Sequence, residues 1–99
     1  MKVYNLYHKD APSGSVYIGR PSRWGNPYVI GKDGNRKEVV EKYTVYLADK
    51  LLNDKEFVAD LKELSKAPGL VCYCKPAECH GDHLVSAMIM MGFVNKEDA

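Results

Sequence analysis

The hydrophobic and polar positions near the start of the chain follow the two-residue period of a strand. Residues 2–7 alternate, and residues 16–18 are β-branched at both ends, so both segments are predicted as strands. A loop with Pro12 and Gly14 separates them. Residues 28–30 are predicted as a short extended piece, followed by a turn centred on Asp33 and Gly34.

The middle of the chain has the spacing of two amphipathic helices. Asn35 is predicted to cap the first helix, with Glu38 completing a capping box, and this helix runs to about Leu52. Asn53 or Asp54 begins the second helix, which residues 68–69, Pro-Gly, bring to an end. The apolar stripes are Val39, Val40, Tyr43, Leu47 and Leu51 in the first helix, and Phe57, Val58, Leu61 and Leu64 in the second.

The last part of the chain is predicted as a strand, a tight turn and a helix. Residues 70–74 are apolar, and Pro76 cannot donate to a strand ladder. From residue 78 or 79 the apolar positions Leu84, Met88 and Met91 fall on one helical face. Gly92 is the predicted C-terminal cap, and residues 95–99 form a frayed tail.

This order of elements predicts one α/β domain over residues 1–99. We expect a small, Rossmann-like sandwich in which about three helices cover a short, mostly parallel sheet. In such sheets, ligands bind at the carboxyl ends of the strands, and a helix N-terminus there favours an anion.

Composition narrows the function classes. With 14 basic and 13 acidic residues the net charge is +1, which gives no electrostatic case for bulk nucleic-acid or membrane binding. Three cysteines, an odd number, argue against a secreted disulfide framework. The start, MKVYNLYHKD, lacks the apolar run of a signal peptide, so we expect a cytoplasmic protein without a membrane span. The chain has seven tyrosines and two phenylalanines, a balance that suits partly exposed surfaces on which the ring is buried and the hydroxyl is hydrogen-bonded.

The loop at residues 19–27 combines side chains that suit a polar ligand. Guanidinium groups fit phosphate or carboxylate, an indole can stack on a base, an amide can read a base edge, and glycine permits close approach. In the alternative interpretation, Trp24 fills the core and the arginines are solvated or pair with Glu38 and Glu41. The ligand-binding candidates are Gly19, Arg20, Ser22, Arg23, Trp24 and Asn26, with Gly25 beside them.

The cysteine-rich stretch at residues 71–83 reads VCYCKPAECHGDH and allows three interpretations. In the first, zinc is held by four ligands drawn from Cys72, Cys74, Cys79, His80 and His83, although no two-residue knuckle spacing and no second cysteine pair exist.

In the second interpretation, Cys79 is a thiolate nucleophile at a helix start, His80 or His83 is its base and Asp82 orients that base. Adjacent residues within a helix do not face each other, which weighs against a Cys79–His80 pair. In the third, Cys79, His80 and Asp82 shape a binding pocket, with no cofactor required.

Two motifs, taken together, resemble the family called domain of unknown function 4326, found in bacteria and many phages. The first, Y-I-G-R-x-S-x-W-G-N-P, stands at residues 17–27, and the second, C-x-C-x-x-x-x-C-H-G-D-x-L, at residues 72–84. The resemblance runs from about Val16 to about Met88, and Tyr73 stands where the family often has tryptophan. The resemblance implies an α/β domain and is consistent with a phage source, but it implies no assigned reaction.

Both motifs can meet at one edge of the sheet, which would gather Arg20, Arg23, Trp24, Asn26, Cys79, His80 and Asp82 around one cleft. Our first hypothesis is a small-molecule binding protein for a nucleotide-like or ribose-containing ligand, for instance a phage protein that sequesters a host signalling nucleotide in the host cytoplasm. The second is an enzyme that cleaves a glycosidic or phosphoester bond of a nucleotide or nucleoside, and the third is a zinc-stabilised interaction module. The sequence does not decide whether the protein only binds this ligand or also converts it.

Self-association is also expected. Residues 88–91, Met-Ile-Met-Met, make the last helix apolar almost all round, and a sheet can cover only one face of it. A homodimer or higher homo-oligomer would bury the remainder.

Overall fold

The computed structural model of the chain is built around a three-stranded, parallel sheet. Its strands are β1 (Val3–Asn5), β2 (Val16–Tyr17) and β3 (Leu70–Cys72), in the order β1-β3-β2. Leu70 is in register with Val3 of β1 and with Val16 of β2, so β3 is the central strand. The structure describes residues 1–73 and 79–95. The prediction of a short, parallel sheet is confirmed.

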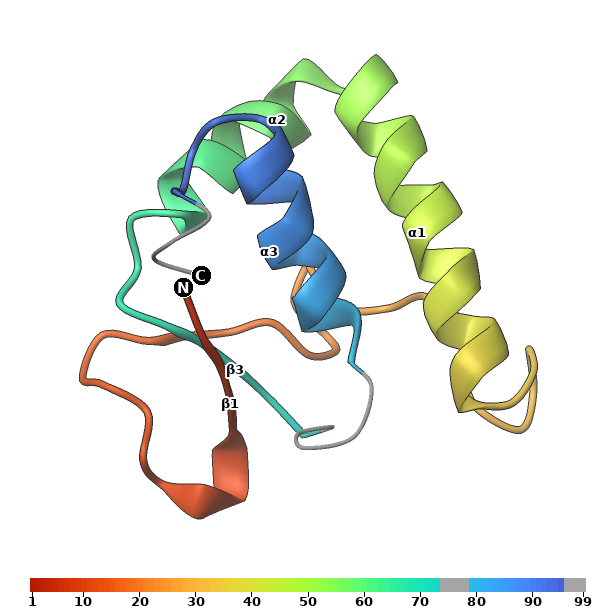
Figure 1. The fold of residues 1–99 in the computed structure, drawn as a ribbon. Coiled ribbons are helices and arrows are strands. Elements are labelled where there is room, and N and C mark those ends of the chain that lie inside the picture. The colour runs from red at the N-terminus through yellow and green to blue at the C-terminus, as the bar shows by residue number, and fades with distance from the viewer. Residues whose placement is uncertain (74–78, 96–99) are drawn as a thin grey trace.

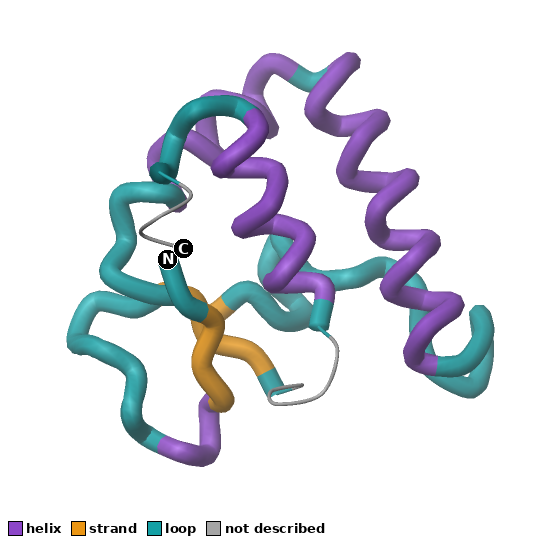
Figure 2. Tube along the Cα trace, in the orientation of Figure 1, coloured by secondary structure: helices purple, strands orange, loops and turns teal. Residues whose placement is uncertain are grey.

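Three α-helices are formed by the described residues: α1 (Arg36–Asn53), α2 (Lys55–Leu64) and α3 (His80–Met90). Figure 1 shows them grouped on one side of the short strands, with α3 lying between α1 and the sheet. The tube in Figure 2 shows how much of the remaining chain is loop. The predicted α/β class is therefore confirmed. Within the described ranges, no helix is long and apolar enough to cross a membrane.

The helix boundaries follow from local capping, as predicted. The Asn35 side chain accepts from the backbone N–H of Glu38 at 2.9 Å, and the Glu38 carboxylate accepts from the Asn35 N–H at 3.0 Å. Asp54 separates α1 from α2 and accepts from the Phe57 N–H at 3.0 Å. Cys79 is the N-cap of α3, one residue before the first helical residue, His80.

One core joins the helices to the inner face of the sheet. Leu70 and Cys72 point into it, whereas Val71 between them is outside the cluster, as the two-residue strand period requires. Gly81 lets α3 approach the sheet closely, because a Cβ there would lie 2.7 Å from the Ile18 side chain. The largest fully buried side chains are Tyr43, Phe57, Ile18, Leu61, Leu70, Leu84 and Met88.

Two predicted strands differ from the structure because side chains take their backbone donors. β1 ends at Asn5, whose side chain accepts from the Tyr7 N–H at 2.8 Å and starts the 3-10 helix η1 (Leu6–His8). The predicted extended piece at residues 28–30 forms only one isolated bridge, from Ile30 to Gly34. The predicted turn at residues 75–77, residue 74 of the predicted strand and residues 96–99 of the predicted tail lie outside the described residues.

Candidate functional site

A cleft of about 370 Å³ opens at the carboxyl ends of β2 and β3. Parallel strands end together at this edge, and the N-terminal parts of α1 and α3 close the cleft from the helical side. This is the place where an open α/β sheet is expected to bind ligands. The lining residues are Tyr17, Gly19, Arg20, Asn26, Tyr28, Val29, Ile30, Arg36, Val39, Val40, Cys72, Tyr73 and His80.

The loop after β2 is folded tightly at its two glycines. A Cβ on Gly19 would lie 2.3 Å from the Tyr17 hydroxyl oxygen, and a Cβ on Gly25 would lie 2.9 Å from the Arg20 backbone nitrogen. The Tyr17 hydroxyl donates to the Arg20 carbonyl at 2.9 Å. Gly19 therefore permits the approach of a protein ring and keeps Arg20 at the mouth of the cleft.

The cleft has a positive rim. Arg20 is exposed and makes no ion pair among the described residues, and Arg36, at the first position of α1, lines the same cleft. The described residues that line the cleft include no carboxylate. Two guanidinium groups at one cleft form a site that suits an anion.

Tyrosine rings supply the aromatic wall. Tyr17, Tyr28 and Tyr73 all line the cleft, and Tyr17 meets Tyr73 edge to face with ring centroids 5.6 Å apart. Burial, and then the neighbouring Tyr73, raise the pKa of Tyr17 to about 12, so its hydroxyl remains a donor at physiological pH. The Lys42 ammonium lies 5.6 Å from the Tyr28 ring centroid and adds positive charge near the wall.

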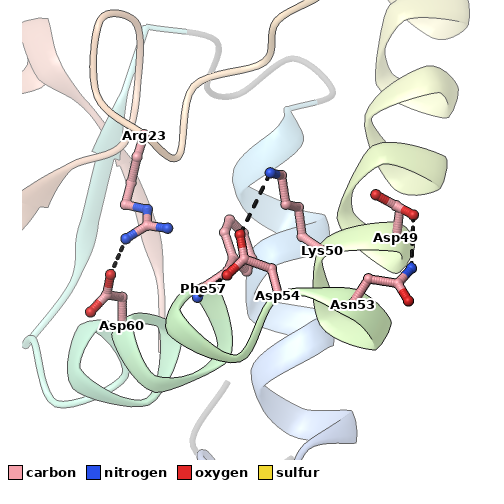
Figure 3. Close-up of polar contacts among 7 residues, drawn as sticks. All are labelled: Arg23, Asp49, Lys50, Asn53, Asp54, Phe57 and Asp60. Carbon is pink, nitrogen blue, oxygen red and sulfur yellow. Dashed lines mark hydrogen bonds and ion pairs between the residues drawn. The ribbon is translucent and has the colours of Figure 1, made fainter.

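Arg23 and Trp24 lie away from the cleft, although both were predicted to bind the ligand. Arg23 pairs with Asp60 of α2 (Figure 3), and its guanidinium lies 5.5 Å from the Trp24 ring centroid. Trp24 is 7% exposed and packs against Phe57 at 5.1 Å. The Trp24 carbonyl accepts from the buried Tyr43 hydroxyl at 2.9 Å. For Trp24 the structure thus matches the alternative interpretation, whereas Arg23 pairs with Asp60 and not with Glu38 or Glu41.

Asn26 lines the cleft, but its amide is engaged by the protein. The Nδ2 group donates to the Val39 carbonyl of α1 at 2.9 Å, and Oδ1 accepts from the Tyr28 N–H at 2.9 Å. Asn26 therefore holds the cleft wall against α1. Ser22 is outside the lining, and its buried hydroxyl has no hydrogen-bond partner among the described residues.

His80 forms the base of the cleft and is almost fully buried. Its Nε2 lies 2.8 Å from the Ile18 carbonyl, so Nε2 carries the proton, because a carbonyl can only accept. This tautomer makes Nδ1 an acceptor, and Nδ1 lies 3.7 Å from the Cys79 sulfur. The ring also packs edge to face against Tyr43 at 5.1 Å.

Cys79 and His80 do contact each other, contrary to the argument from helical spacing. That argument fails because Cys79 is the N-cap with extended backbone, so it does not belong to the helical turn. The Cys79 sulfur accepts from the Gly81 N–H at 3.3 Å and lies 2.8 Å from the Cys72 sulfur. Cys79 itself has no exposed surface and is outside the cleft lining, so the structure places this thiol in the core.

Of the remaining predicted residues that the structure describes, Cys72 lines the cleft and Asp82 and His83 do not. Asp82 and His83 are half-buried in the first turn of α3. Cys74, one of the zinc candidates, lies outside the described residues. Within the described ranges, no group of three or more histidine, cysteine or acidic side chains could hold a metal ion. The zinc interpretation thus gains no support from the residues that the structure describes.

Sequence reasoning missed Tyr17, Tyr28, Arg36 and Tyr73 as cleft residues. The signal that could have found the rings was the excess of tyrosine, since seven tyrosines stand against two phenylalanines. Arg36 carries no comparable signal, because an arginine at a helix start is ordinary.

Residues 4–89 match the family described as Domain of unknown function (DUF4326). The chain belongs to the DUF4326 family. The resemblance inferred from two motifs is therefore confirmed. A relative in Enterobacteria phage T4, described as an uncharacterized 12.4 kDa protein in the nrdA-td intergenic region, is 32% identical over 96 residues, which cover 93% of this chain and 83% of the relative. No solved structure gives a significant match.

The matched range includes every residue that lines the DUF4326 cleft, from Tyr17 to His80. Neither the family description nor the phage relative names a ligand or a reaction, so the function must be argued from the cleft itself.

Proposed function

We propose that this DUF4326 protein binds a small, nucleotide-like or ribose-containing anion in the cleft at the ends of β2 and β3. The observation that carries the proposal is one cleft with two arginines, three tyrosine rings and no acid in its described lining. Arginine suits phosphate, and aromatic faces suit a base. The apolar side chains Val29, Val39 and Val40 complete the lining and favour a ligand with a flat, apolar part.

The size of the cleft supports a mononucleotide-sized occupant. A volume of about 370 Å³ is at the lower end of the range, about 300–1,000 Å³, in which small-molecule sites fall. Arg20 and Arg36 stand on different segments, so a phosphate between them could accept from both guanidinium groups while a base contacts the tyrosine wall. The net charge of +1 favours a compact ligand over a polyanion.

Binding without turnover is favoured over catalysis by the state of the candidate catalytic groups. Both nitrogens of His80 already have partners in the protein, the Ile18 carbonyl and the Cys79 sulfur. Cys79 has no exposed surface. A general base needs a free nitrogen and a thiol nucleophile needs access to the ligand, and the engaged His80 and the buried Cys79 do not offer these in this arrangement.

The phage relative supports a setting for this binding. We propose that the ligand is a signalling nucleotide of the infected host, which a phage protein would sequester in the host cytoplasm. Sequestration requires tight binding and no chemistry, which agrees with the engaged histidine and the buried cysteine.

The proposal is tested by calorimetry with a nucleoside, its 5′-monophosphate and inorganic phosphate. The monophosphate should bind more tightly than either part, and Arg20→Ala should weaken it about tenfold to a hundredfold, because a hydrogen bond to a charged group contributes about 1.5–3 kcal/mol. Arg23→Ala is the matched control from the same loop, and it should bind like the parent because Arg23 contacts α2.

A parent protein that binds neither nucleoside nor nucleotide would refute the proposal, as would equal losses in Arg20→Ala and Arg23→Ala. Mass spectrometry of the nucleotide recovered after incubation and heat release separates binding from turnover. Unchanged nucleotide supports a binding protein, and cleaved nucleotide supports the enzyme alternative.

A further inference from the structure

A row of tyrosines leads from the cleft to the outside of the molecule. Tyr17 and Tyr73 line the cleft, and Tyr73 also contacts Tyr7, with ring centroids 5.4 Å apart and planes inclined by 44°. Tyr7 belongs to η1 and is not part of the cleft lining. The three rings come from three separate segments of the chain, and Tyr73 is common to both contacts.

One side chain holds the outer part of this row in place. Asn5 accepts from the Tyr7 N–H at 2.8 Å and donates through Nδ2 to the Tyr73 carbonyl at 3.3 Å. The segments that carry Tyr7 and Tyr73 are thus fixed to each other through Asn5, which is a positioning residue. An aromatic surface built in this way is ordered before a ligand arrives, so less conformational entropy is lost on binding.

Packing does not account for these outer rings. Tyr7 is 73% exposed and Tyr73 is 51% exposed, and neither belongs to the hydrophobic core. Tyrosine rings that are exposed beside an arginine-lined cleft offer π-faces on which a heterocyclic base can stack. The site therefore continues beyond the volume that one nucleotide would fill.

We propose that the ligand is a dinucleotide, whose first nucleotide occupies the cleft and whose second base stacks on Tyr7 and Tyr73 outside it. This inference rests on the proposed function and adds the ligand class. Arg20 lines the cleft beside Tyr17 and Tyr73, where it can neutralise the phosphate that links the two nucleosides. The end of a longer single-stranded nucleic acid would offer the same two bases and linking phosphate. A protein net charge of +1 favours the dinucleotide over such a polyanion.

The test compares the affinities of pA, pApA and a six-residue oligoadenylate for the parent, Tyr7→Ala and Tyr7→Phe. The parent should bind pApA at least tenfold more tightly than pA and no more weakly than the hexamer. Tyr7→Ala should weaken pApA about five- to a hundredfold, as loss of one stacked base does, and leave pA within twofold. Tyr7→Phe keeps the ring and should retain the preference. Tyr46→Ala is the control for loss of a tyrosine ring elsewhere, because Tyr46 lies outside the cleft lining and packs against Tyr43; this variant should lose stability and keep the preference for pApA.

The outcomes separate this inference from the proposed function. If pA binds and pApA has no advantage, or if Tyr7→Ala weakens both equally, the dinucleotide inference is wrong and the cleft proposal stands. If the hexamer binds much more tightly than pApA, the ligand is a single strand and the inference is also wrong. If neither pA nor pApA binds, both proposals fall together.

Discussion

Replacing Asn26 with alanine should cost stability, because its amide joins the cleft wall to α1. The variant loses the bond to the Val39 carbonyl and the bond from the Tyr28 N–H, each 2.9 Å long and part-buried. A typical net contribution of about 1 kcal/mol per bond, plus desolvated partners left behind, gives a loss of about 2–3 kcal/mol. For a domain of this size the midpoint of thermal unfolding should fall by roughly 10 °C or more.

The assay is urea and thermal unfolding of Asn26→Ala beside a matched control, Asn53→Ala. Asn53 donates to Asp49 at 2.9 Å on the exposed side of α1 (Figure 3), so its loss should change stability by no more than about 0.5 kcal/mol. Asn26→Asp keeps the acceptor for Tyr28 but sets an oxygen against the Val39 carbonyl, and should lose about half or more of the stability that Asn26→Ala loses. If Asn26→Ala unfolds like the parent and binds nucleotide poorly, the amide reads the ligand and the structural role is wrong.

Three further predictions follow from the core and the last helix. Burial raises the pKa of Tyr43, so this tyrosine ionises first in the unfolded chain and the free energy of unfolding should decline above about pH 10. The urea midpoint of Tyr43→Phe should therefore decline less steeply between about pH 8 and 11 than that of the parent. An equally steep decline in both proteins would contradict a contribution of Tyr43 to the pH dependence. Cys79→Ser keeps an acceptor for the Gly81 N–H, so its free energy of unfolding should lie within about 1–2 kcal/mol of the parent's and its affinity for nucleotide should be unchanged. A variant that is as stable as the parent but binds nucleotide more weakly would show that Cys79 belongs to the binding site. Met90 is 74% exposed at the end of α3, and burial of this side chain between two copies of the chain would favour self-association. Light scattering should therefore give a mass above the 11.1 kDa of one chain, and Met90→Glu should reduce that mass. A parent protein with the mass of one chain would refute self-association.

The helices were predictable from the sequence because their signals are local. The capping box of Asn35 and Glu38 and the cap at Asp54 need only neighbouring residues, and both form as expected. The strands were less predictable, because a side chain can divert a backbone donor from the ladder. Asn5 ends β1 in this way, and Asp33 accepts from the Val29 N–H at 2.8 Å within the predicted extended piece.

The candidate site was predictable only in part. The sequence indicated the right loop and the right helix start, and four of the predicted binding residues, Gly19, Arg20, Asn26 and His80, do line the cleft. It could not indicate that Arg20 lies at the cleft while Arg23, three positions on, contacts α2. Loops have no fixed period, so spacing does not show which way a side chain points.

The sequence by itself thus determined the class of fold, the family and the edge of the sheet where a site belongs, because these depend on periodicity, caps and two contiguous motifs. Only the tertiary structure decided which side chains meet there. Tyr28, Arg36 and Tyr73 stand on separate segments, and they meet at one cleft because α1 packs against α3, whose first residue, His80, also lines it. The same packing buries Trp24 and Cys79, since a core of this size takes up the apolar and sulfur side chains nearest to it.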